Sequence, residues 1–351
     1  MLVVKDIKPS IQTMTKVSAQ PKKRMILSLQ SMRLFAALGV FQFHLWHNYL
    51  GVVFGHPGTD FFFVLVGVVA ALVQAKRIPD AGWKSYIQAR YIRIYTTYIP
   101  LFFIVLAFKW HEGSWGWALR SFFFLPMTSD QLPVIGSSWM ISSFMLFYYI
   151  FSIAFIARRE SVLWPIFTVW FISIVLYTWF NWRYGLPDHW AWLLFNERNL
   201  EFIFGYLAGV ILRERKVVIY WGRWLFWIGM IGIVAGTVLI NINVNENTIG
   251  RSFFIGLPIA IFVFGLVVLE QQGATDYLVR ILTKPGLVWL GGTSYVLYIS
   301  HGIYLRIWSR FFPVTPVLIP IITVGALCIG SIGYFLWESP LLRYSKKVLK
   351  K

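Results

Sequence analysis

The chain has 351 residues, of which 58% are hydrophobic, 19% aromatic and only 13% charged. A soluble domain needs about a quarter of its residues charged to cover its surface, so this composition excludes an ordinary soluble protein. The net charge is +18, from 32 Lys and Arg against 14 Asp and Glu. Such an excess can indicate nucleic-acid binding, but the basic residues lie mostly between apolar segments, as in cytoplasmic loops of membrane proteins. We therefore expect a lipid bilayer and no nucleic acid as a partner.

About ten apolar segments follow one another along the chain, each near the roughly 20 residues with which a helix crosses a bilayer. We predict an all-α integral membrane protein, a bundle of about ten transmembrane helices. A basic tail over residues 1–25, a transmembrane domain over 26–342 and a second basic tail over 343–351 are expected. The segments are Leu27–Tyr49, Gly58–Ala75, Tyr91–Phe108, Ser138–Ala157, Leu163–Phe180, the short Leu200–Leu212, Trp221–Ile240, Phe253–Leu269, Val288–Trp308 and Val314–Trp337, while Leu119–Met127 is too short to cross.

Basic residues are concentrated in every second connection, which predicts the orientation of the bundle. With the N-terminus inside, the inner side holds Lys76, Arg77, Lys84, Arg90, Arg93, Arg158, Arg159, Arg213, Arg215, Lys216, Arg280, Lys284, Arg343, Lys346, Lys347, Lys350 and Lys351, and the outer side holds mainly Arg120, Arg183, Arg198 and Arg310. We therefore expect cytoplasmic N- and C-termini in a multi-pass protein of the cell (inner or plasma) membrane. No cleavable signal peptide is expected, because the first apolar segment is too long and lacks a small-residue cleavage site.

Two ionisable residues, Arg33 and His44, lie within the first apolar segment. Their separation of eleven residues is about 16 Å, or three full turns, so both lie on one face of the helix. Ionisable groups inside a bilayer are costly and mark functional sites. Histidine is suited to general-base catalysis near neutral pH and arginine to anion binding. The alternative is that Arg33 snorkels to the inner headgroups while His44 makes an interhelical hydrogen bond.

Three further charged residues lie near the ends of neighbouring segments. Asp60 opens the second segment at about the depth of His44, where its carboxylate is placed to hold one imidazole nitrogen; its alternative role is a helix N-cap. Arg90 and Arg93 are three residues apart and share one helix face. Two guanidinium groups so placed bind phosphates well, although ordinary positive-inside charge explains them equally.

Several short motifs occur in one order along the chain, namely Arg33-x10-His44, Gly58-Thr59-Asp60-Phe61-Phe62-Phe63, Arg90-x-x-Arg93, Arg198 with Glu201-Phe202-x-x-Gly205, Leu290-Gly291-Gly292-Thr293 with Tyr298 and His301, and Glu338-Ser339-Pro340. Together they resemble the membrane-bound acyltransferase-3 family, which O-acylates bacterial polysaccharides and other acceptors. The resemblance covers about residues 27–344, and the opening Leu29-Gln30-Ser31-Met32-Arg33 is most similar to the exopolysaccharide-production branch.

The resemblance implies a membrane O-acyltransferase domain over residues 26–342. It implies transfer of an acyl group, usually acetyl, from cytoplasmic acyl-CoA to a hydroxyl of a lipid-linked or nascent glycan. His44 would be the catalytic base or acyl relay, and Arg33 would help to hold it or the donor. Arg90 and Arg93 would contact the CoA phosphates. Acyl-CoA is then a substrate, and no permanently bound cofactor or metal is expected.

The same resemblance adds further candidate site residues, which are Glu201, Gly291, Gly292, Tyr298, His301 and Glu338. The glycine pair would permit close backbone approach. His301 would line the cavity or make a structural hydrogen bond. The single cysteine, Cys328, lies in an apolar segment and indicates neither a disulfide within the chain nor a thiol-based metal site.

Three positions depart from the family's pattern: Phe144 replaces a common Glu, Val66 a Ser and Thr96 a Pro. If that Glu binds the acceptor, Phe144 indicates a different acceptor or weak activity. We favour a changed acceptor, because the charged residues nearest the donor are intact. Two other functions remain open. One is a transporter or flippase, since such bundles also bury charges, and the other is a catalytically silent family member that aids polysaccharide assembly.

Overall fold

The computed structural model describes residues 26–52, 57–109, 111, 113–127, 131–185, 191–214, 219–243, 250–273 and 276–348, so the predicted tail over 1–25 and Arg215, Lys216, Lys350 and Lys351 lie outside it. Within these ranges the chain is helical and contains no strand, which confirms the all-α class. The α-helices are α1 (Leu27–Leu50), α2 (Gly58–Val69), α3 (Trp83–Lys109), α4 (Trp115–Phe122), α5 (Trp139–Ala157), α6 (Leu163–Tyr184), α7 (Ala191–Phe195), α8 (Asn199–Glu214), α9 (Ile219–Asn243), α10 (Leu257–Gln271), α11 (Tyr277–Leu282), α12 (Pro285–Phe311), α13 (Ile319–Gly333) and α14 (Ser339–Val348).

Seven helical segments within the described ranges are long and apolar enough to cross a membrane. Three of the predicted spans correspond to helices outside this set. Helix α8 has only 16 residues. Helices α1 and α12 have 24 and 27 residues and are long enough, but polar side chains lower their hydropathy. The structure therefore supports a multi-pass membrane protein, while the count of ten spans and the cytoplasmic termini stay predictions.

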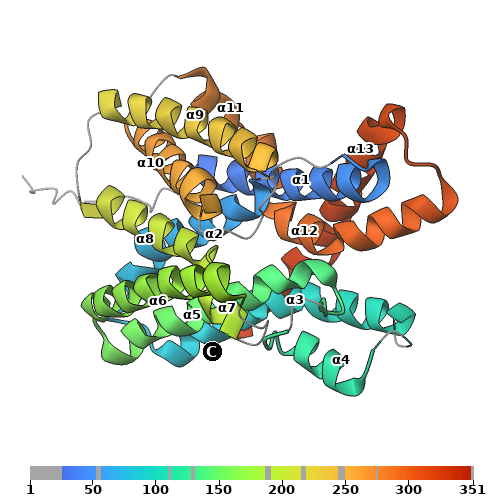
Figure 1. Cartoon of the computed structure of the whole chain (residues 1–351), viewed down its shortest axis with the longest axis horizontal. Helices are drawn as coiled ribbons and strands as arrows, with labels where there is room; N and C mark the ends of the chain where they lie inside the picture. The colour runs from blue at the N-terminus through green and yellow to red at the C-terminus, as the bar shows by residue number, and fades with distance from the viewer. Residues whose placement is uncertain are drawn as a thin grey trace, which may run out of the picture.

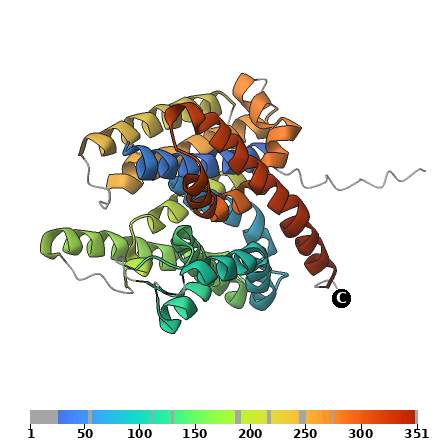
Figure 2. The same ribbon diagram turned by 90° about the vertical axis from the view of Figure 1, so that its right-hand side faces the viewer.

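The helices form two groups that are visible in both ribbon views (Figures 1 and 2). One group contains α3 to α7, and the other contains α1, α2 and α9 to α13. Helix α8 joins them, because it packs against α2 on one side and α6 on the other. The red C-terminal helices cross from the second group toward the first, where α14 packs on α3 (Figure 2).

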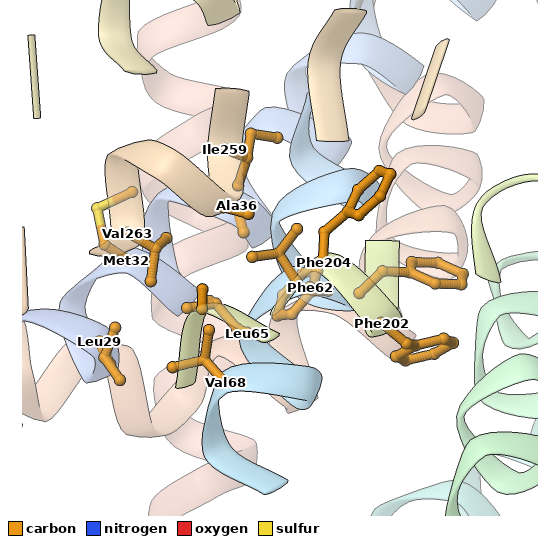
Figure 3. Packing of buried hydrophobic residues seen from close by; sticks show 14 of the residues in the cluster. Leu29, Met32, Ala36, Phe62, Leu65, Val68, Phe202, Phe204, Ile259 and Val263 are labelled. Atoms are coloured by element: carbon orange, nitrogen blue, oxygen red, sulfur yellow. The ribbon is translucent and has the colours of Figure 1, made fainter. Parts of the chain in front are cut away.

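Helices α1, α2, α8 and α10 interlock in the largest apolar cluster, part of which is shown in Figure 3. The crossing of α2 and α8 requires glycine on both helices. A Cβ added to Gly67 would lie 2.2 Å from the carbonyl oxygen of Phe202, and one added to Gly205 would lie 2.1 Å from that of Val64. Small residues allow transmembrane helices to pack backbone against backbone in this way. This contact holds the α2 segment at a fixed depth beside α8.

The start of α1 is stabilised by a carboxylate from a distant helix. Ile26 provides no side-chain cap. Instead, Glu270 of α10 accepts hydrogen bonds from the backbone amides of Leu27 at 2.7 Å and Ser28 at 2.9 Å. These are two of the amides that a helix N-terminus leaves unpaired, and a negative charge is favourable there. The contact anchors the end of α1 from which Arg33 projects.

The predicted loop position of Arg90 was wrong, and the structure adds detail at two other predicted stretches. Helix α3 begins at Trp83 and not at Tyr91, so Arg90 lies within a helix and not in a loop. The last predicted tail is helical as far as Val348. The stretch Leu119–Met127 contains only the end of the eight-residue helix α4, after which the chain turns through Phe124 with φ 55°. Prediction from apolar segments located the apolar centres of the helices but missed their polar ends.

Candidate active site

A cavity of about 180 Å³ lies between the two helix groups, with walls from α1, α2, α3, α5 and α12. Its polar wall consists of Arg33, Gln74, Arg90 and Arg93. Its remaining wall is apolar or aromatic and consists of Phe62, Leu65, Val66, Val69, Ile94, Met140, Ile141, Phe144, Tyr148, Tyr295 and Tyr298. The three predicted donor-side arginines thus meet in one cavity, although they come from α1 and α3.

Arg93 is held by Glu338, which the sequence places 245 residues later. Its Nη1 lies 2.7 Å from Oε1 of Glu338. The other carboxylate oxygen accepts a hydrogen bond from Thr97 at 3.0 Å. The Glu338 side chain is completely buried, whereas the Arg93 side chain is 33% exposed. Glu338 therefore orients Arg93 from behind and leaves the guanidinium accessible from the cavity.

Arg90 is held by aromatic rings and not by a carboxylate. Its guanidinium lies 5.2 Å from the ring centroid of Tyr86 and 5.5 Å from that of Tyr148. Its Nε is buried and has no hydrogen-bond partner in the part of the chain that the structure describes. Cation–π contacts hold a guanidinium while leaving its donors available. Arg90 is thus arranged to bind an anion that enters the cavity.

Arg33 reaches the cavity where α1 and α12 cross closely. A Cβ added to Gly291 would lie 2.0 Å from the backbone oxygen of Gln30, so only glycine fits at this crossing. The side chain of Arg33 makes one long hydrogen bond, 3.4 Å, to Oε1 of Gln30. At Gly292 an added Cβ would meet side-chain atoms only, the nearest being the hydroxyl of Tyr334 at 3.2 Å. The close approach expected of the glycine pair belongs chiefly to Gly291.

The two intramembrane histidines, His44 and His301, stack on one another. Their ring centroids are 5.1 Å apart, with an interplanar angle of 22°. Nδ1 of His301 lies 2.5 Å from the carbonyl oxygen of Tyr298. Because a carbonyl only accepts, Nδ1 donates and the neutral ring keeps its lone pair at Nε2. Neither histidine lines the cavity; the pair lies beyond Tyr298, less than one turn further along α12.

Tyr298 separates the cavity from the histidine pair. Its ring contacts Phe62 at 5.6 Å and His301 at 5.8 Å between centroids. Its hydroxyl donates a 2.6 Å hydrogen bond to the carbonyl oxygen of Ser137, just before α5. This bond ties α12 to α5 across the two helix groups. The predicted site residues Arg33, Tyr298, His301 and His44 therefore follow one another along the α1–α12 contact.

The structure pairs Asp60 with Arg251 and not with His44. The guanidinium of Arg251 donates two short hydrogen bonds to the carboxylate of Asp60, 2.9 Å from Nε to Oδ1 and 2.8 Å from Nη2 to Oδ2. The cap of α2 is Pro57, so the N-cap alternative is also wrong. The physical reason is that both carboxylate oxygens already face a buried guanidinium, which is their strongest available partner.

Glu201 also belongs to this second cluster and not to the cavity. Its side chain contacts that of Asp60, and its Oε1 accepts a 3.3 Å hydrogen bond from Ser252. Arg198, at the start of the same segment, lies 5.2 Å from the ring centroid of Trp139. The resemblance to the family identified Glu201 but missed Arg251. An arginine directly before an apolar segment on the side with few basic residues was the available signal.

Three π-helical turns coincide with these polar groups in the described chain. Ala70–Gln74 ends on the cavity residue Gln74, Ser252–Gly256 directly follows Arg251, and Tyr334–Glu338 ends on Glu338. A π turn inserts one residue and shifts the helix face that follows it, and such turns are frequent at functional sites. No sequence pattern predicted them.

Comparison with known proteins agrees with this arrangement. A family model described as an acyltransferase domain, that of the acyltransferase-3 family, matches residues 26–335. The chain is 26% identical over 310 residues to the exopolysaccharide production protein ExoZ of Rhizobium meliloti (strain 1021), covering 82% of this chain and 90% of that protein. No solved structure matches. The family match includes every residue of the cavity, and the chain therefore belongs to the acyltransferase-3 family of membrane acyltransferases.

Proposed function

We propose that the protein is a membrane O-acyltransferase that moves an acetyl group from cytoplasmic acetyl-CoA to a hydroxyl of an exported bacterial glycan. The observation that carries this proposal is a single cavity with three arginines at one end and Tyr298, backed by the His44–His301 stack, at the other. The family supplies the reaction class. The similarity to an exopolysaccharide production protein supports a glycan acceptor.

The arginines form the donor end of this site. Gln74 lies near the end of the second segment, and Arg90 is the eighth residue of α3. Under the positive-inside orientation, both are on the cytoplasmic side. Arg33, Arg90 and Arg93 would bind the CoA phosphates, since guanidinium groups bind phosphate through paired, charge-assisted hydrogen bonds. The acyl end of the donor then points along the cavity toward Tyr298.

His44 would act as the base at the other end. As the acceptor oxygen attacks the thioester carbonyl, His44 takes its proton, the C–S bond breaks, and the proton passes to the departing thiolate. The products are an O-acyl ester and free CoA. A variant route acylates His44 first and transfers the acyl group in a second step. His301 would position His44 through the ring stack.

The first test is acetyl transfer by purified protein in liposomes, with acetyl-CoA and a lipid-linked glycan. His44→Ala should abolish transfer. The matched control is His47→Ala, on the same helix, exposed and stacked on Phe43. Full activity of His44→Ala would rule out its role as base. Glycan movement without acylation would support the transporter alternative, and inactivity of the wild type would support the silent assembly protein.

The second test concerns the donor end. Arg90→Ala combined with Arg93→Ala should raise the apparent KM for acetyl-CoA while the folded protein is retained. Lys84→Ala is the control, because it removes one positive charge from the start of the same helix without reaching the cavity. An unchanged KM in the double variant would contradict the donor assignment.

A further inference from the structure

We propose that the apolar half of the cavity is an acyl-chain pocket and that Phe144 limits the length of chain it accepts. This inference rests on the proposed donor, acyl-CoA. It concerns selectivity among donors, which no feature of the arginine cluster explains. Three observations support it: the order of the lining residues, the fixed position of Phe144 and the chemistry of the wall.

The lining residues are ordered along two helices. On α2, Phe62, Val66 and Val69 lie on one face, and the helical segment continues to Gln74. Phe62 and Gln74 are twelve residues apart, so the cavity follows the segment for about 18 Å. Along this segment, the cavity therefore runs from an apolar end at Phe62 to the polar end that contains the arginines.

Helix α5 shows the same order. Tyr148, which stacks on Arg90, lies one turn from Phe144, and Met140 and Ile141 lie one turn beyond that. One turn is about 5.4 Å. A donor whose phosphates bind at Arg90 must therefore pass Phe144 before its acyl group reaches Met140. Phe144 therefore stands between the arginines and the apolar end of the cavity, where the acyl group arrives after the pantetheine arm.

The ring of Phe144 is held in place by two other rings. It contacts Phe63 at 5.4 Å and Phe202 at 5.6 Å between centroids, at interplanar angles of 69° and 72°. These are edge-to-face contacts, the favoured geometry for aromatic pairs. Phe63 and Phe202 are themselves fully buried. Phe144 cannot turn away without displacing core side chains, so it acts as a fixed wall.

The chemistry of this wall favours an alkyl chain over a sugar. Its side chains come from Phe62, Val66, Met140, Ile141 and Phe144 and provide no hydrogen-bond partner for a hydroxyl. Burying unpaired hydroxyls is costly. Each buried CH₂ group, in contrast, improves affinity roughly fourfold. With Phe at position 144 this part of the wall is apolar.

The experiment measures binding of thioether analogues of acetyl-, butyryl- and hexanoyl-CoA to the full-length protein in detergent, which needs no acceptor and no turnover. Wild-type affinity should fall with chain length. Phe144→Ala and the milder Phe144→Leu should reverse that trend, with a gain of roughly fourfold for each CH₂ that the enlarged pocket buries. Val66→Phe, which narrows the pocket, should weaken even the acetyl analogue.

Phe147→Ala is the matched control. Phe147 lies on the same helix, is fully buried, and packs on Phe151, Phe167 and Phe202 without lining the cavity. Its loss should lower stability and leave the chain-length trend unchanged. The same trend in wild type and both Phe144 variants would overturn the pocket. A trend that shifts as expected in a protein that transfers no acyl group would support the pocket and reject the proposed reaction.

Discussion

The Asp60–Arg251 pair and the Arg93–Glu338 pair are both ion pairs inside the helical bundle, but they differ in what remains accessible. Asp60 and Arg251 are 0% and 1% exposed, and two bonds join them. Glu338 is equally buried, whereas Arg93 is 33% exposed and faces the cavity. A closed pair satisfies its own charges and fixes the fold. An open pair keeps one charge oriented for a ligand.

The difference arises from what surrounds each arginine. Arg251 lies at a π turn and is enclosed by α2 and α8 through Asp60 and Glu201. Arg93 is supported only from one side, by Glu338 and, through it, Thr97. We therefore expect substitutions in the closed pair to change stability most and substitutions in the open pair to change donor binding most.

The largest effect is expected for Arg251→Met. It leaves the Asp60 carboxylate buried without its partner, at a cost of roughly 3–5 kcal/mol of folding free energy. Thermal unfolding in detergent should show a large loss of stability or no folded protein. Combining it with Asp60→Leu removes both charges and should restore much of the loss. Equal stability of Arg251→Met and wild type would show that the pair is not structural.

A smaller effect on folding and a larger one on function are expected for Arg93→Met. Glu338 retains its hydrogen bond from Thr97, and the space left by the partly exposed Arg93 side chain is open to water, so the loss of stability should be smaller than for Arg251→Met. A charge-assisted hydrogen bond to a donor phosphate contributes about 1.5–3 kcal/mol, so CoA binding should weaken about tenfold or more. Calorimetric titration with CoA measures this. If Arg93→Met loses stability as severely as Arg251→Met, the distinction between the pairs fails.

Glu338→Gln should act in the opposite direction on binding. Glutamine keeps an oxygen that accepts from Thr97 but removes the negative charge beside Arg93. Because that carboxylate competes with donor phosphates for the guanidinium, CoA should bind more tightly, by about fivefold for a change near 1 kcal/mol. Weaker binding would mean that Glu338 is needed mainly to orient Arg93. The Thr97→Val variant, which lacks the hydroxyl, separates orientation from charge.

The smallest difference between the two ion pairs is expected in their response to salt concentration. Raising the ionic strength from about 0.1 M to 1 M shortens the Debye length from about 10 Å to 3 Å. CoA binding at the partly exposed Arg93 should weaken several-fold, while the unfolding temperature set by the closed pair should hardly change. Salt-independent CoA binding would argue against phosphate recognition in this cavity.

Much of the fold was predictable because it depends on local composition. The apolar runs predicted an all-helical membrane bundle, and their spacing brought Arg33 and His44 to one helix face. The same method ranked α1 and α12 as ordinary spans, although neither is among the seven described segments apolar enough to cross a membrane. Several of their polar residues, such as Ser31, Thr293 and Ser294, are buried against other helices. A hydropathy pattern does not show which side of a helix faces the bundle.

The site was predictable only in part. The resemblance identified Arg90, Arg93 and Glu338 but not that Glu338 holds Arg93. The depth at which the second segment begins predicted Asp60 beside His44, whereas the pairing partner is Arg251, 191 residues away in sequence. Contacts over such separations depend on how helices cross and on where π turns shift a face. A glycine can indicate that a helix is closely approached, but a single sequence shows neither which helix crosses there nor where a π turn lies.

The sequence by itself determined the membrane class, the approximate helices and the charged residues available for chemistry, because each depends on composition and short-range periodicity. The tertiary structure decided which charges pair and which remain open. In the structure Asp60 pairs with Arg251, whereas Arg93 faces the cavity. His44 stacks on His301, and Phe144 forms part of the cavity wall. In a bundle without solvent, a buried charge must find its partner in another helix, so helix packing selects the site.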